Sequence, residues 1–282
     1  MFESIGRSFE LVRTSWNILM DDKKLLVFPV LSGIVTIIVI LSFIFPLLVT
    51  GALMGMSDAG PVVYYGLLFL FYIVSYFVVI FFNTALISCV NAKLNGKDMS
   101  VGEGLSNSAR HLPAILGWAL VSATVGIILH LLERRSGLLG RIVLALVGGV
   151  WALVTYFVVP VLILEEKGVY DSLKESVTLI RKTWGESIVG SAGIAIVFVA
   201  IGVIAAFAVV ATLFLGSLVV FGAALALFLV LLVVLAVIYS AMQGIYVTAL
   251  YTYAKTGTVP SAFHPDLIQN AFVPKQAGPG NI

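Results

Sequence analysis

The apolar stretches of the sequence hold few side chains that could do chemistry, and these few are amides, hydroxyls and one imidazole. They are Asn83, Thr84, Ser88, His130 and Gln243. Polar groups are expensive to place in hydrocarbon, so they are functional candidates by default. Amides and hydroxyls either bond to a neighbouring helix or form a polar pathway that contacts a ligand. Because no carboxylate or lysine accompanies them, a proton relay lacks its usual groups.

The sequence lacks the arrangement that nucleophilic catalysis requires. Gly190-Ser-Ala-Gly193 is similar to the Gly-x-Ser-Gly of rhomboid proteases, but its Ser stands one place too early. A catalytic histidine must touch its nucleophile, whereas we expect His130 near the opposite membrane face. The sequence also lacks a Gly-rich phosphate loop, so ATP hydrolysis is not predicted. We therefore expect that the protein is not an enzyme.

Histidines and paired carboxylates do not have the spacing of a metal site. The three histidines are far apart in the sequence: His111, His130 and His264. The single Cys leaves them without the thiolate partners that zinc often takes. Glu165 and Glu166 could bind a cation, but the adjacent Lys167 favours a solvated face. We expect no metal and no cofactor.

The composition indicates an all-α polytopic membrane protein. Of 282 residues, 61% are hydrophobic and 11% charged, and the mean hydropathy is +1.13. A soluble protein carries about 25% charged residues, and a net charge of +2 is too small for nucleic-acid binding. A spanning helix needs about 20 apolar residues. The stretches without charge predict six spans, with two in the last: 25–57, 59–92, 111–132, 142–164 and 187–254.

Basic residues predict the orientation. Thirteen of the 16 Lys and Arg residues fall on the side that holds both termini, and the other three are Arg134, Arg135 and Arg141. Positive charge is enriched in cytoplasmic loops. We therefore expect a multi-pass protein of the plasma membrane with both termini in the cytoplasm. Within the last stretch, Gly216-Ser217 is the predicted turn.

Cytoplasmic segments repeat three times, which predicts three parallel units of an amphipathic cytoplasmic helix plus a transmembrane hairpin. Gly-x-x-x-Ser follows each even-numbered span, beginning at Gly96, Gly168 and Gly257, and the residues after each Ser align without gaps. The predicted units are 1–97, 98–168 and 169–258. Residues 259–282 form a flexible Pro/Gly-rich tail.

The repeated helices carry predicted caps and anchors. The predicted cap residues are Ser4, Ser100, Glu103, Ser172 and Glu175. Ser-x-x-Glu is a capping box, in which hydroxyl and carboxylate each satisfy one backbone N–H. Trp16 and Trp184 occupy matching places on the apolar stripes, where Trp favours the headgroup region. The stripes either pack under the bundle as a collar or contact lipid.

Five segments resemble an uncharacterised family of prokaryotic six-span membrane proteins. They are Phe81-Phe-Asn-Thr-Ala-Leu, Ser100-Val-Gly-Glu-Gly-Leu, Tyr156-Phe-Val-Val-Pro-Val-Leu, Arg181-Lys-Thr-Trp-Gly-Glu and Ala249-Leu-Tyr-Thr-Tyr-Ala-Lys-Thr-Gly. More distantly, the pattern is similar to the membrane domain fused to some glycerophosphodiester phosphodiesterases. The resemblance implies a fold and no activity. The chain has no room for the phosphodiesterase barrel.

Two functions fit this sequence. The first is a non-catalytic membrane module that binds lipid, an amphiphile or a partner membrane protein. The second is a homo-oligomeric channel or transporter, whose lining would need Asn83, Thr84 and Ser88. Small residues recur every fourth position from Ala236 to Thr248 and favour close helix approach. That ridge serves packing within one bundle or between copies of the chain.

The orientation predicts which sites a membrane-impermeant thiol reagent reaches. In a Cys89→Ala background, we expect Arg7→Cys and Lys275→Cys to resist the reagent in intact cells. Ser136→Cys, in the loop expected outside, should be labelled. Labelling at position 7 or 275 in intact cells would overturn the orientation.

Overall fold

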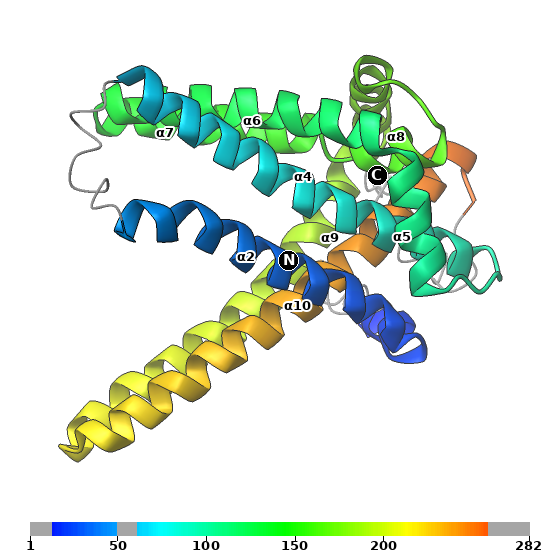
Figure 1. The fold of residues 1–282 in the computed structure, drawn as a ribbon. Helices are drawn as coiled ribbons and strands as arrows, with labels where there is room; N and C mark the ends of the chain where they lie inside the picture. The colour runs from blue at the N-terminus through cyan, green and yellow to red at the C-terminus, as the bar shows by residue number, and fades with distance from the viewer. Residues whose placement is uncertain (1–12, 50–60, 259–282) are drawn as a thin grey trace, which may run out of the picture. The chain divides into compact units, whose positions relative to one another are not determined.

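The computed structural model describes residues 13–49 and 61–258, except the side chains of residues 61, 135, 184–191 and 215. Within this part of the chain the regular elements are all helices (Figure 1). Six of them are long and apolar enough to cross a membrane, which confirms the six predicted spans. Helices suit this role because every backbone N–H and C=O is bonded within its own segment.

Helix 13–21 comes first in the described chain. The elements that follow are η1 (Lys23–Leu26), α2 (Val27–Val49), α4 (Pro61–Leu94), α5 (Val101–Arg110), α6 (Leu112–Arg135), α7 (Leu138–Val154), α8 (Val158–Leu164), α9 (Val169–Ala211), η2 (Thr212–Leu215) and α10 (Leu218–Thr256). With 34 residues, α4 is about 51 Å long at 1.5 Å per residue. It is therefore longer than the hydrocarbon core, which is about 30 Å thick.

The described chain divides into two compact units. One contains residues 30–49, 61–89 and 98–180, and the other contains 13–29, 90–97 and 181–258. The division in α9 falls at Arg181, two residues before Thr183, whose φ of −123° and ψ of 19° interrupt the helix. We call the first of these units the α4–α8 unit and the second the α9–α10 unit.

Left-handed residues end several helices. Gly216 has a φ of 64° and Ser217 caps α10 by accepting a hydrogen bond from the N–H of Val220. This confirms the predicted turn between spans five and six. Gly96 and Gly257 each have a φ of 71°. Glycine suits these positions because it lacks the Cβ that disfavours positive φ.

Span four is interrupted between α7 and α8. Pro160 has no N–H to donate, and its ring crowds the carbonyl four residues earlier. Just before it, the backbone hydrogen bonds span three residues instead of four. The N–H of Tyr156 donates to the carbonyl of Leu153, and the N–H of Val158 donates to the carbonyl of Thr155. The carbonyl of Val154 and the N–H of Phe157 thereby lose their usual helical partners.

One buried hydroxyl satisfies both groups. The Oγ of Ser176, on α9, donates to the carbonyl oxygen of Val154 at 2.7 Å. It also accepts a hydrogen bond from the N–H of Phe157 at 3.0 Å. Ser176 is fully buried, so water is not an alternative partner. The start of α9 is therefore joined to the break in span four.

An apolar cluster surrounds this break. The rings of Trp118 and Trp151 stack at 6.0 Å, which ties α6 to α7, and these helices lie side by side (Figure 1). Ile115, Val158 and Leu162 are completely buried in the same cluster. The core of the α4–α8 unit thus lies where α4, α6 and α8 meet, with Trp151 of α7 packed against it.

The bridging role of Ser176 predicts a specific loss of stability. Ser176→Ala should lower the unfolding free energy by about 1–3 kcal/mol, because it leaves two buried backbone groups unpaired. Thr178→Ala is the control, since Thr178 is exposed and bonds within its own helix. Thermal unfolding in detergent measures both, and equal midpoints would contradict the bridge.

Candidate functional site

Two of the predicted polar residues, Thr84 and Ser88, lie one helical turn apart on α4. The Nδ2 of Asn107, on α5, donates to the Oγ of Ser88 at 2.9 Å. That hydroxyl in turn donates to the carbonyl oxygen of Thr84 at 2.9 Å. The Oγ1 of Thr84 is buried and has no hydrogen-bond partner among the described residues. Ser88 therefore links α4 to α5.

Asn83 and His130 lie outside this network. Both are half-buried, and Asn83 shares α4 with Ser88 while His130 is on α6. The structure thus does not join the predicted polar residues of the α4–α8 unit into one site. Gln243 belongs to the α9–α10 unit.

The cap predicted at Ser100 forms in the structure. The Oγ of Ser100 accepts a hydrogen bond from the N–H of Glu103 at 3.2 Å. Glu103 returns a bond, its Oε2 accepting from the N–H of Ser100 at 2.7 Å. Hydrogen bonds from the backbone and hydroxyl of Ser100 lower the pKa of Glu103. Because the folded pKa is depressed, the contribution of this cap is lost as the pH falls through that value.

The cap predicted at Ser172 and Glu175 is wrong. Helix α9 begins at Val169, and the N–H of Ser172 already bonds to the carbonyl of Gly168 at 2.9 Å. Ser172 therefore lies inside the first turn, and Gly168 has the position of the cap. Gly is acceptable there because a cap residue needs only non-helical backbone angles. Glu175 pairs with Lys167 instead, at 3.4 Å.

Of the two predicted tryptophan anchors, the structure describes the side chain of Trp16 only. Trp16 is 40% exposed, while its neighbours Ile18 and Leu19 are buried. Trp16 thus flanks the buried face of helix 13–21. The side chain of Trp184 and all of Ser4 lie outside the described residues.

Glu165 and Glu166, the two carboxylates after span four, have different neighbours. Lys167 pairs with Glu165 at 2.8 Å, whereas the side chain of Glu166 is 81% exposed. The Oε1 of Glu166 lies 4.0 Å from the Nε2 of His111. The Nδ1 of His111 is 2.7 Å from the carbonyl oxygen of Asn107, so Nδ1 carries hydrogen.

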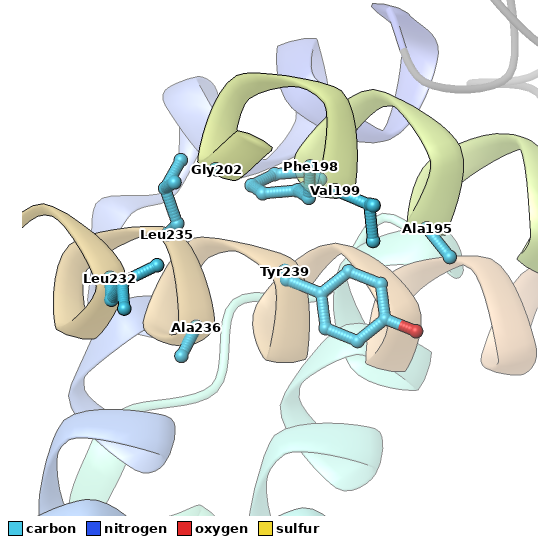
Figure 2. Close-up of a pocket in the computed structure, with 8 residues that line it drawn as sticks. All are labelled: Ala195, Phe198, Val199, Gly202, Leu232, Leu235, Ala236 and Tyr239. Atoms are coloured by element: carbon cyan, nitrogen blue, oxygen red, sulfur yellow. The ribbon is translucent and has the colours of Figure 1, made fainter. Parts of the chain in front are cut away.

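The α9–α10 unit contains an apolar groove of about 410 Å³, and Figure 2 shows it with α9 on one side and α10 on the other. Its lining residues are Ala195, Phe198, Val199 and Gly202 from α9, and Leu232, Leu235, Ala236 and Tyr239 from α10. Each set follows the spacing i, i+3, i+4, i+7, which places it on one helix face. Small residues on both helices leave space between the larger side chains.

One end of this groove is polar. The ring of Tyr239 meets that of Phe198 edge-on, with centroids 5.6 Å apart. The Nε2 of Gln243 donates to the hydroxyl oxygen of Tyr239 at 3.1 Å. This bond uses the hydroxyl as an acceptor, so its own proton is available to donate. We call Tyr239 and Gln243 the polar end of the groove.

Sequence reasoning missed three residues that matter here. Tyr239 stands four residues before Gln243, so helical spacing could have paired them. The serine at 176 drew no attention as a buried bridge, because its partner groups belong to the backbone. Asn107 lies 19 residues from Ser88 in the sequence, so no local spacing pairs them.

The contact between Ser88 and Asn107 predicts energetic coupling. In a double-mutant cycle of Ser88→Ala and Asn107→Ala, we expect about 0.6–2 kcal/mol of coupling, as for interhelical hydrogen bonds in membranes. Ser75→Ala combined with Asn107→Ala is the control, because the Ser75 hydroxyl has no hydrogen-bond partner. Thermal unfolding in detergent supplies the energies. Equal coupling in both cycles would show that the contact contributes nothing specific.

The comparisons with known proteins identify a family. Residues 62–261 match the model of DUF6159, a family of unknown function. The chain matches neither a curated protein nor a solved structure, so the distant resemblance to phosphodiesterase membrane domains gains no support. The matched region covers most of the 282 residues. The chain therefore belongs to DUF6159, a family of unknown function.

Proposed function

We propose that this protein is a non-catalytic membrane module that binds the hydrocarbon chain of a lipid or other amphiphile. The observation that carries the proposal is the groove between α9 and α10, which is apolar along its length and polar at one end. An amphiphile has the same division. Its chain would lie in the groove, and an oxygen of its head region would accept the Tyr239 hydroxyl proton.

The size and position of the groove support this assignment. About 410 Å³ is within the range of about 300–1,000 Å³ that small-molecule sites occupy. The groove begins at Ala195, three residues into a span that runs over Ala192–Phe214. Three residues correspond to about 5 Å of helix. A lipid of the adjoining leaflet could therefore enter without crossing the hydrocarbon core.

The orientation from the basic residues assigns that leaflet to the cytoplasmic side. In this proposed orientation, both termini lie in the cytoplasm. We also propose that the protein resides in the plasma membrane. The polar end then faces the headgroups of the inner leaflet, because Gln243 is further toward the cytoplasmic end of α10 than Tyr239 is.

A channel or transporter has less support. Its proposed lining on α4 includes Ser88, whose hydroxyl is bonded to both Thr84 and Asn107. That bonding favours a role in holding α4 against α5. A lining role for Asn83 would need a second copy of the chain or a partner membrane protein to complete the pathway.

Photo-crosslinking tests the proposal. The purified protein would be placed in vesicles that contain a phospholipid with a diazirine near the end of one acyl chain. We expect labelling to concentrate on the peptides that line the groove. Gly202→Leu should reduce that labelling at least fivefold, because its side chain fills the space. Tyr239→Phe should weaken it less, since only the hydroxyl is lost.

The control for Gly202→Leu is Gly222→Leu, on α10, where an added Cβ meets open space. It adds the same side chain at a distance from the groove and should leave labelling unchanged. Labelling spread evenly over exposed positions such as Val230 and Val233 would indicate annular lipid only. That outcome would refute a specific site.

A further inference from the structure

We infer that a second groove, between α4 and α6, binds an anionic phospholipid, with one acyl chain in the groove and its phosphate at Arg134. The groove and the arginine both belong to the α4–α8 unit. This site differs from the proposed α9–α10 site in its residues and in the charge of its ligand. Either site can fail a test without affecting the other.

The groove measures about 560 Å³ and is apolar. Its walls are Val62, Tyr65, Gly66 and Phe69 of α4, together with Thr124 and Ile127 of α6. The four α4 residues share one helix face, by the spacing i, i+3, i+4, i+7. A Cβ added at Gly66 would meet nothing within 4 Å, so the absence of a side chain there keeps the groove open.

Arg134 lies beyond the end of the groove that Val62 lines. It follows Ile127 by seven residues on α6, which is nearly two full turns and about 10 Å along the axis. It therefore falls on the face that carries Ile127. The Nη1 of Arg134 lies 3.5 Å from the hydroxyl of Tyr64, in the first turn of α4. Both helices thus bring the same end of the groove to the arginine.

Among the described residues, no carboxylate neutralises the charge of Arg134. Its guanidinium lies 6.0 Å from the centroid of the Tyr64 ring, and no described carboxylate forms an ion pair with it. The remaining N–H donors of a guanidinium form a planar fork that matches phosphate oxygens. An apolar groove near a guanidinium that no described carboxylate neutralises has the polarity of an anionic phospholipid.

Two tyrosines near Arg134 support a position at the boundary between hydrocarbon and headgroups. The rings of Tyr64 and Tyr65 meet edge-on at 5.1 Å, and Tyr65 also lines the groove. Tyrosine prefers the boundary between hydrocarbon and headgroups. The two tyrosines therefore mark the depth at which an acyl chain gives way to a phosphate, next to Arg134.

Native mass spectrometry in a neutral detergent tests this inference. The probes are phosphatidylglycerol and phosphatidylcholine with identical acyl chains. We expect the wild type to retain more phosphatidylglycerol, and Arg134→Gln to abolish that preference while leaving phosphatidylcholine retention unchanged. Arg134→Lys should keep part of the preference. Gly66→Leu should reduce the retention of both lipids severalfold.

Matched controls separate this site from general effects of charge and bulk. Arg141→Gln removes another arginine from the same loop region, and Gly222→Leu adds bulk at an open position on α10. Both should retain the wild-type preference. Equal losses in Arg134→Gln and Arg141→Gln would overturn the inference. Displacement of phosphatidylglycerol by inorganic phosphate alone, at equal concentration, would show an anion site without lipid and would also overturn it.

Discussion

Membrane-spanning segments must satisfy their own backbone hydrogen bonds, because hydrocarbon offers no replacement partners. Pro160 breaks that rule in span four, and the Ser176 hydroxyl restores it by bonding to Val154 and Phe157. The serine is on α9, so the repair also fixes where α9 begins relative to α7 and α8. The same placement brings Lys167 between Glu165 and Glu175. A local defect in one helix thus organises the charged segment that follows it.

The spans and the turn at Gly216-Ser217 could be predicted because each depends on local chemistry. Length and apolarity define a span, and positive φ favours glycine. The cap at Ser172 could not be predicted reliably, since Ser100 and Ser172 have the same Ser-x-x-Glu pattern. The difference lies in the preceding glycine. Gly96 has a φ of 71° and α5 begins only at Val101, whereas α9 begins directly after Gly168, four residues earlier in the alignment. Two identical motifs therefore differ in structure because their flanking backbones differ.

Small residues occupy deeply buried positions on α5 and at the start of α9. Ser176 is fully buried on α9, and Gly104 is buried on α5. These two residues occupy matching positions in the gapless alignment. Small side chains allow close helix approach, and a hydroxyl adds a hydrogen bond. Hydropathy ranks both residues low, so a periodicity argument overlooks these buried positions.

Small residues have a second effect in the spans. Ala236 was expected to bring helices together, but in the structure it helps to leave the groove open, as Gly202 does on α9 and Gly66 on α4. Lipid tails and apolar side chains are chemically alike, so hydrophobicity alone does not decide what fills such a groove. If the grooves bind lipid as proposed, selectivity would come from the polar group near one end of each, the hydroxyl of Tyr239 and the guanidinium of Arg134. In the proposed sites, these end groups are therefore the features that would distinguish one lipid from another.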